Sequence, residues 1–242
     1  MTNKRGIICA MQPFLSPAEA PAWLVFPVRN GKLRCEIRKT IMTRALVVVT
    51  MGSASYRNHP VTYRLAEHLS YLHITTVLAD LLTPEELSEH RYRFDTEKIC
   101  TRLELLVRYL KSHPSYHGLP MGIFGGGTGA HAVLTSAARM PGQIGALVCM
   151  DGLAGMENSP LDHVTTPTLL VHHQDDPDQI TSNEHAGQRI KGWCMVEKIR
   201  SGMQTPGREE INSMASWFAR FLLRRNTSMN HPVPIKIHAE NG

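Results

Sequence analysis

Residues 121–130 read MGIFGGGTGA, the most specific pattern in the chain. It begins as a short apolar strand, continues as a glycine-dense turn, and leads into a run with helical spacing. A strand, a glycine turn and a helix in this order are typical of the elbow pattern G-x-S-x-G, whose strained turn packs tightly against a sheet. In that pattern Gly127 stands at the apex, where a nucleophilic side chain is expected, and glycine supplies none.

The elbow lies within an alternation of strands and helices. Residues Ala45–Thr50 (ALVVVT) form a continuous β-branched run, as expected of a strand buried on both faces. The further strands we expect are Ile74–Ala79, Met121–Phe124, Ile144–Met150, Thr168–His172 and Met195–Ile199. The helices we expect are 60–72, 95–112, Thr128–Ala138, 182–191 and Glu209–Arg224. This alternation predicts the α/β class, as a three-layer α/β/α sandwich with a mostly parallel central sheet.

The residues before the first central strand have a different pattern. Asn30 and Gly31 separate two extended runs, which is a strong hairpin signal, so residues 22–38 are predicted to form an N-terminal antiparallel edge hairpin. We therefore expect a basic N-terminal segment at 1–21, a single domain at 22–225 and a C-terminal tail at 226–242.

Charge and composition limit the classes of function. Residues 1–44 carry a formal charge of +6, residues 45–219 carry −4, and residues 220–242 carry +3, so the basic character belongs to the two ends. No aromatic residues alternate with these basic residues, which argues against nucleic-acid binding. No apolar run is long enough to span a membrane. The five cysteines form no CxxC pair, which favours the reducing cytoplasm and excludes a disulfide framework.

In a sheet of this kind, ligands bind beyond the carboxyl ends of the strands. The loops at that edge are 51–59, 80–94, 125–131, 151–163, 173–181 and 200–207.

Several motifs in and beside these loops resemble one family over residues 45–224. They are Gly52-Ser53-Ala54-Ser55, Asp80-Leu81-Leu82-Thr83-Pro84-Glu85-Glu86, Arg93-Phe94-Asp95, Gly118-Leu119-Pro120, Pro167-Thr168-Leu169-Leu170-Val171 and Trp217-Phe218. With the elbow at Gly125–Gly129, the chain resembles α/β-hydrolases of the dienelactone-hydrolase-like type. The resemblance implies an α/β-hydrolase fold and an origin among ester hydrolases.

The resemblance also implies a Ser-Asp-His triad, whose positions in this chain are largely degenerate. The serine position is Gly127. The acid is carried over to Asp175, with Asp176 beside it. The histidine position falls near Gln204 or Thr205, and no histidine occurs between His185 and His231. Of the three triad residues, the resemblance retains only the acid.

The oxyanion loop of such enzymes is implied at Gly52, Ser53 and Ala54, preceded by Met51 where a histidine often stands. Together with Gly126, Gly127 and Thr128, these backbone amides are predicted to form an anion-binding nest.

Replacement groups for the missing pair remain an alternative. Thr128 or Ser53 is a substitute nucleophile in this interpretation, with His131 or the pair His172-His173 as the base. The competing interpretation makes Thr128 a helix-capping residue and His131 a partly buried polar residue.

Two further patterns overlap the site. Residues Gly125–Ala130 also fit the dinucleotide fingerprint G-x-G-x-x-G/A, with Asp151 at the end of the next expected strand as the ribose-binding acid. The cluster of His172, His173, Asp175, Asp176 and Asp178 has metal-ligand residue types, but adjacent histidines on a strand point to opposite faces. We therefore predict no metal and no cofactor.

The sequence thus predicts a catalytically inactive, cytoplasmic relative of ester hydrolases that binds a small anionic ligand or a protein partner. An active ester hydrolase with relocated residues and a dinucleotide-binding protein remain the alternatives.

Overall fold

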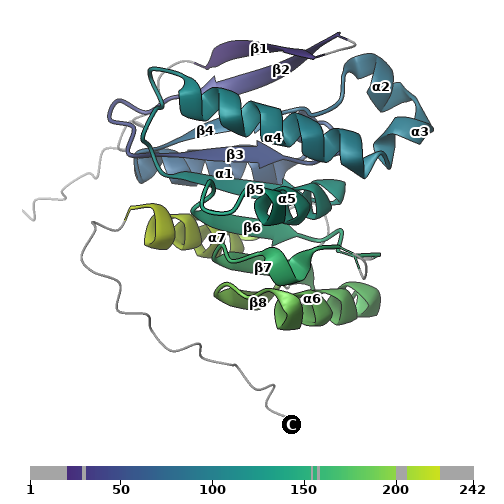
Figure 1. The fold of residues 1–242 in the computed structure, drawn as a ribbon. Coiled ribbons are helices and arrows are strands. Elements are labelled where there is room, and N and C mark those ends of the chain that lie inside the picture. The colour runs from purple at the N-terminus through teal and green to yellow at the C-terminus, as the bar shows by residue number, and fades with distance from the viewer. Residues whose placement is uncertain (1–20, 29–30, 154, 157–158, 200–205, 224–242) are drawn as a thin grey trace, which may run out of the picture.

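The structure, a computed structural model, describes residues 21–28, 31–153, 155–156, 159–199 and 206–223. An eight-stranded sheet in the order β1-β2-β4-β3-β5-β6-β7-β8 runs through its centre (Figure 1). The strands are β1 (Ala22–Val28), β2 (Gly31–Arg38), β3 (Ala45–Thr50), β4 (Ile74–Ala79), β5 (Met121–Gly126), β6 (Ala146–Met150), β7 (Thr168–His173) and β8 (Cys194–Ile199). Strands β3 to β8 are parallel, which confirms the predicted architecture.

Helices cover both faces of this sheet. They are α1 (Pro60–Tyr71), α2 (Pro84–Ser88), α3 (His90–Arg93), α4 (Thr96–Ser112), α5 (Thr128–Arg139), α6 (Pro177–Arg189) and α7 (Arg208–Leu222), with short 3-10 helices η1 (Tyr56–Asn58) and η2 (Leu161–His163). Helices α4, α5 and α6 pack on one face, whereas α1 and α7 pack on the other (Figure 1). Neighbouring strand residues alternate between the two cores, so that Val48 joins the α4–α6 side and Val49 the α1–α7 side.

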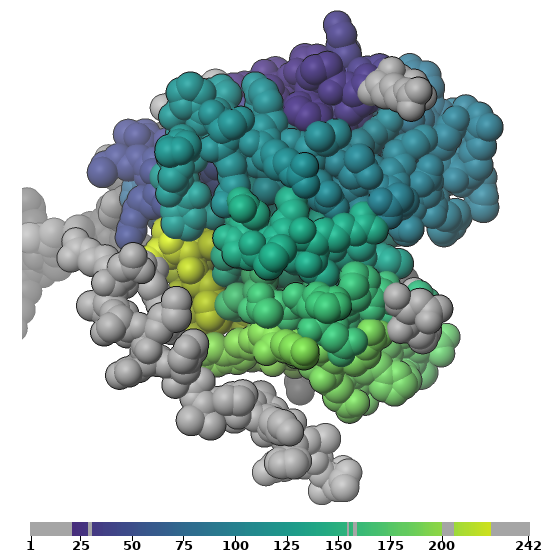
Figure 2. All heavy atoms as spheres, in the orientation of Figure 1, coloured from purple at the N-terminus to yellow at the C-terminus, as the bar shows by residue number. Residues whose placement is uncertain are grey.

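The N-terminal hairpin is confirmed. Strand β1 is the outermost strand and pairs antiparallel with β2, which in turn pairs antiparallel with β4. In the space-filling view the hairpin forms the upper rim of the molecule (Figure 2). The apolar side chains of Trp23 and Val25 are exposed on β1. The predicted N-terminal segment, apart from residue 21, and the predicted C-terminal tail lie outside the described residues.

The segment predicted as the loop 80–94 contains two short helices instead. Helix α2 begins with a capping box, in which the Thr83 hydroxyl accepts from the Glu86 amide and the Glu86 carboxylate accepts from the Thr83 amide. Pro84 at the first helical position reinforces this start. Helix α6 likewise begins at Pro177 rather than 182, because the Asp176 carboxylate accepts from the Gln179 amide and caps it.

A buried ion pair ties α2 to α4. Two nitrogens of the Arg102 guanidinium donate to the Glu86 carboxylate, and one of them also donates to the Leu81 carbonyl oxygen. Each charged side chain is 8% exposed. Burial alone raises the pKa of Glu86, but hydrogen bonds from Arg102 and from the Thr83 amide lower it to about 2. The pair therefore holds the α2 segment beside the sheet with both charges compensated.

Within the ranges that the structure describes, no helix has both the length and the apolar character required to cross a bilayer.

Candidate functional site

The candidate site is built around the turn between β5 and α5. Gly127 stands at its apex with φ +54° and ψ −130°, a conformation that L residues adopt only with strain. The neighbouring glycines are fixed by packing. A Cβ on Gly125 would lie 2.5 Å from the Gly129 carbonyl oxygen, and a Cβ on Gly129 would lie 2.9 Å from the Gly52 nitrogen. The elbow geometry expected from the sequence is therefore present.

Gly127 differs from these neighbours because the space around it is open. A Cβ built there meets no heavy atom within 4 Å. Its amide donates to the Met150 carbonyl oxygen at 3.0 Å, so the residue is anchored by its backbone alone. A hydroxyl-bearing side chain would fit this position, but the chain provides none, and the apex has no nucleophile.

The oxyanion loop lies over the first turn of α5. A Cβ on Gly52 would lie 2.3 Å from the Gly129 nitrogen, which shows how closely the two backbones approach. Thr128 Oγ1 accepts from the Ser53 amide at 2.7 Å and donates to Ser53 Oγ at 2.8 Å. The Ala54 amide donates to the Met51 carbonyl oxygen at 3.3 Å. The amides of Gly52, Ser53, Ala54 and Gly127, all predicted for the anion nest, therefore already have acceptors within the protein.

Met51 closes the other side of this loop. Its side chain is 5% exposed, and its Cε lies 2.5 Å from where a Cβ on Gly126 would stand. Gly126 therefore makes room for Met51, and an apolar thioether occupies the position at which a histidine is often found in the resembling family.

An aspartate–histidine pair lies next to the apex. Asp151 follows β6, and a Cβ on its neighbour Gly152 would lie 2.0 Å from the Gly127 carbonyl oxygen, so this backbone touches the elbow directly. The Asp151 carboxylate lies 3.6 Å from Nε2 of His173, at the end of β7. Burial raises the pKa of Asp151 above its usual value, whereas the nearby His173 lowers it in part.

Asp151 also has a strained backbone, with φ +56°. Glycine would adopt this angle without penalty, whereas an aspartate there costs roughly 1 kcal/mol. Its Oδ1 atom is buried with no hydrogen-bond partner among the described residues. A strained, buried carboxyl group is characteristic of a functional position. The sequence had singled out Asp151 only for ribose binding, and the pairing with His173 was not predicted.

Asp175 and Asp176, in the loop after β7, differ in their exposure to solvent. Asp175 is exposed in the turn after β7. Asp176 is half-buried and caps α6, and its charge contributes to the raised pKa of Asp151. Gln204, the predicted position of the lost base, lies outside the described residues.

The remaining predicted histidines have structural partners. Nε2 of His131, on α5, lies 3.2 Å from Ser159 Oγ, and burial lowers the pKa of His131. His172 is fully buried, with its Nδ1 3.0 Å from the His173 carbonyl oxygen. The described residues contain no group of histidine, cysteine, aspartate or glutamate side chains arranged to hold a metal ion.

Comparisons with known proteins bear on the fold and on the relatives of this chain. No family model matches the chain. Two curated proteins of Mycobacterium tuberculosis strains, both named "Putative phosphoribosyl transferase", are 33% identical over 180 residues, which is 72% of this chain but 41% of each relative. The chain therefore spans less than half the length of these relatives.

The solved structures match over nearly their whole length. A dienelactone hydrolase from Anabaena variabilis is 26% identical, with a TM-score of 0.77, and the match covers 85% of this chain and 99% of that one. A dienelactone hydrolase-like promiscuous phosphotriesterase from metagenomic libraries is 16% identical, with a TM-score of 0.66 over 84% of this chain and 98% of that one.

Proposed function

We propose that this chain, which has the dienelactone-hydrolase-like α/β-hydrolase fold, binds a small molecule over Gly127 and does not hydrolyse esters through an acyl-enzyme. The observation that carries the proposal is the open space at Gly127 within an otherwise intact elbow. The turn is retained, whereas the group that would attack a bound carbonyl is missing.

The neighbouring hydroxyls do not supply a substitute. Acyl transfer requires a nucleophile that a general base deprotonates. The hydroxyl of Thr128 already accepts a hydrogen bond from the Ser53 amide and donates one to the Ser53 hydroxyl. These two bonds hold the oxyanion loop against α5, which is a structural role. The sequence between His185 and His231 contains no histidine that would serve as the base at the predicted position.

The charges at the site bear on the ligand. Asp151 places a carboxylate beside the apex, and the amides of Ser53 and Ala54 already have acceptors. Carboxylates accept hydrogen bonds and repel anions. We therefore favour a ligand that donates hydrogen bonds over the anionic ligand expected from the sequence.

Phosphoribosyl or dinucleotide ligands find little support at this turn. Such ligands place a phosphate on free amides at a helix N-terminus. Here Gly52 covers the Gly129 nitrogen and Thr128 holds the Ser53 amide. The curated relatives are named as phosphoribosyl transferases, but the match covers only 41% of each of them. Their name therefore describes proteins that consist mostly of residues without a counterpart in this match.

The first prediction concerns esterase activity. Purified protein is expected to hydrolyse p-nitrophenyl acetate no faster than buffer, because the apex bears no nucleophile. Gly127→Ser is expected to fold, since the space is open, and to remain inactive because the base is absent. Gly127→Ser combined with Gln204→His is expected to regain weak turnover. Stopped assays at several enzyme concentrations measure this, and robust turnover by the unaltered chain would refute the proposal.

A second candidate function is hydrolysis by direct attack of water, which the Asp151–His173 pair favours. The space left by the missing side chain at Gly127 is open to a water molecule. In this reaction the water oxygen bonds to the ester carbonyl carbon while one of its protons passes to His173. The bond between the carbonyl carbon and the alkoxide oxygen then breaks, and the protonated His173 returns the proton to the departing alkoxide, which leaves a carboxylic acid and an alcohol. No bond to the protein forms, and Asp151 orients the imidazole.

The second candidate makes a separate prediction. If it operates, His173→Gln lowers ester turnover about 100-fold, in line with the contribution of a general base. Asp151→Asn is expected to lower it less, and the exposed His90→Gln serves as the matched control with unchanged turnover. Equal activity of the three variants would exclude this candidate and leave the binding function.

A further inference from the structure

A cavity that is separate from the turn at Gly127 lies between α6 and the segment that follows β6. We call it the α6 cleft, and its volume is about 510 Å³. Its floor is formed by Leu153, Met156, Leu161 and Ala186, whose side chains are otherwise buried. Small-molecule sites typically measure about 300–1,000 Å³ and are mainly apolar with a few polar groups.

We propose that the α6 cleft binds a neutral, mainly apolar small molecule of up to about two fused rings with one hydrogen-bonding group. The size follows from volume, because an apolar cavity of about 150 Å³ already holds benzene. The hydrogen-bonding group follows from the rim, where Ser182 and His185 of α6 border the apolar floor.

The walls of the cleft are held in place from two helices. The Arg189 guanidinium, from α6, donates to the Ser159 carbonyl oxygen at 2.8 Å and to the Asp162 carboxylate at 3.0 Å. From α5, His131 contacts the Ser159 hydroxyl at 3.2 Å. Ser159 and Asp162, opposite α6, are thus held in place before any ligand arrives, which reduces the entropy lost on binding.

The charge of the cleft favours a neutral occupant. Arg189 lines it, but its guanidinium already pairs with Asp162 and with backbone carbonyl oxygens. An anionic ligand would have to compete with these partners, and a buried charge without a partner is strongly unfavourable.

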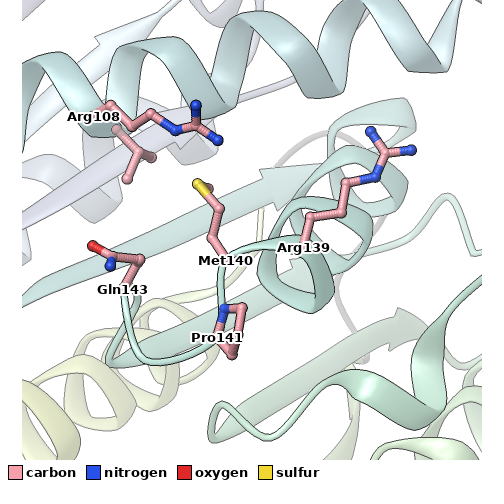
Figure 3. Close-up of a pocket in the computed structure, with 6 residues that line it drawn as sticks. Arg108, Arg139, Met140, Pro141 and Gln143 are labelled. Atoms are coloured by element: carbon pink, nitrogen blue, oxygen red, sulfur yellow. The ribbon is translucent and has the colours of Figure 1, made fainter.

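Another cavity differs from the α6 cleft in size and in the charge of its lining. It measures about 380 Å³ and lies where α5 ends, with Arg108 and Arg139 on either side of Met140 (Figure 3). Arg139 donates to both Glu97 oxygens, at 2.7 and 2.8 Å, and Arg108 lies 3.7 Å from Glu104. It is smaller than the α6 cleft, and polar side chains make up half of its six lining residues, so it carries no proposal.

The test uses 1-naphthol as the probe, titrated into the full chain by isothermal calorimetry. We expect saturable binding with a Kd below about 1 mM and a negative heat-capacity change. Ser182→Phe, which fills the rim, is expected to weaken binding at least tenfold. Glu184→Phe adds the same ring on the same helix at an exposed position outside the lining, and it should retain the affinity within about threefold.

The outcomes separate this site from the one at Gly127. Loss of binding with Gly127→Ser but not with Ser182→Phe would place the probe at the elbow and overturn the proposal. Equal loss with both phenylalanine variants, or no binding at ~1 mM, would also overturn it. The anion 1-naphthoate is expected to bind at least tenfold more weakly than 1-naphthol, and tighter binding of the anion would contradict the neutral class.

Discussion

Replacing Gly152 by alanine is expected to lower the free energy of unfolding by about 4 kcal/mol, or to prevent folding. The added Cβ would lie 2.0 Å from the Gly127 carbonyl oxygen and 2.7 Å from its Cα, and neither backbone atom can move without disturbing the elbow. The glycine also has φ +75°, which adds strain for any residue with a side chain.

Gly142→Ala is the matched control, because it has nearly the same backbone angle, φ +73°, and no atom within 4 Å of the new Cβ. It isolates the strain of the left-handed backbone, about 1 kcal/mol. Urea unfolding of the two variants measures the difference. If their midpoints coincide, the close approach of residue 152 to the elbow does not contribute to stability.

Replacing Arg102 by methionine is expected to lower the free energy of unfolding by about 3 kcal/mol, because Glu86 would stay buried without its main partner. Lys98, 3.3 Å from the same carboxylate, compensates only in part. Arg91→Met is the control, since its pair with Glu89 is exposed and such pairs contribute less than about 1 kcal/mol.

The same pair predicts a dependence on pH. The pKa of Glu86 is about 2 in the folded chain, against a usual value of 4.5. A carboxyl group with a lowered folded pKa stabilises the fold above its unfolded pKa and loses this effect as the pH falls toward 2. Thermal melting between pH 6 and pH 2 should therefore show a smaller loss for Arg102→Met than for the unaltered chain. A parallel loss in both would show that the ion pair is not responsible.

The sequence predicted the sheet because its signals are local. The run Ala45–Thr50 is buried along its whole length. A Cβ on Gly125, Gly126 or Gly129 of the elbow would lie less than 3.0 Å from another atom, so these positions require glycine. The short helix α2 was not predicted although its signal was present. Thr83 and Glu86 form a capping box, but the helix that follows Thr83 has only five residues. Short elements of this kind are held by tertiary contacts, here the Glu86–Arg102 pair.

The site was harder to predict because its contacts join distant residues. The bond between Ser53 and Thr128 spans 75 positions, so the occupied amide could not be found from spacing. Asp151 follows β6, and His173 ends the neighbouring strand β7, one residue beyond the predicted end at His172. The backbone of Asp151 is left-handed, an angle that only a few per cent of non-glycine residues adopt, so the sequence alone does not predict it.

The conformation of Gly127 makes the stability of the elbow depend on which residue occupies its apex. At φ +54° glycine is relaxed, whereas serine would carry about 1 kcal/mol of backbone strain. Any side chain introduced at this apex is therefore expected to lower the free energy of unfolding, although the space around it is open.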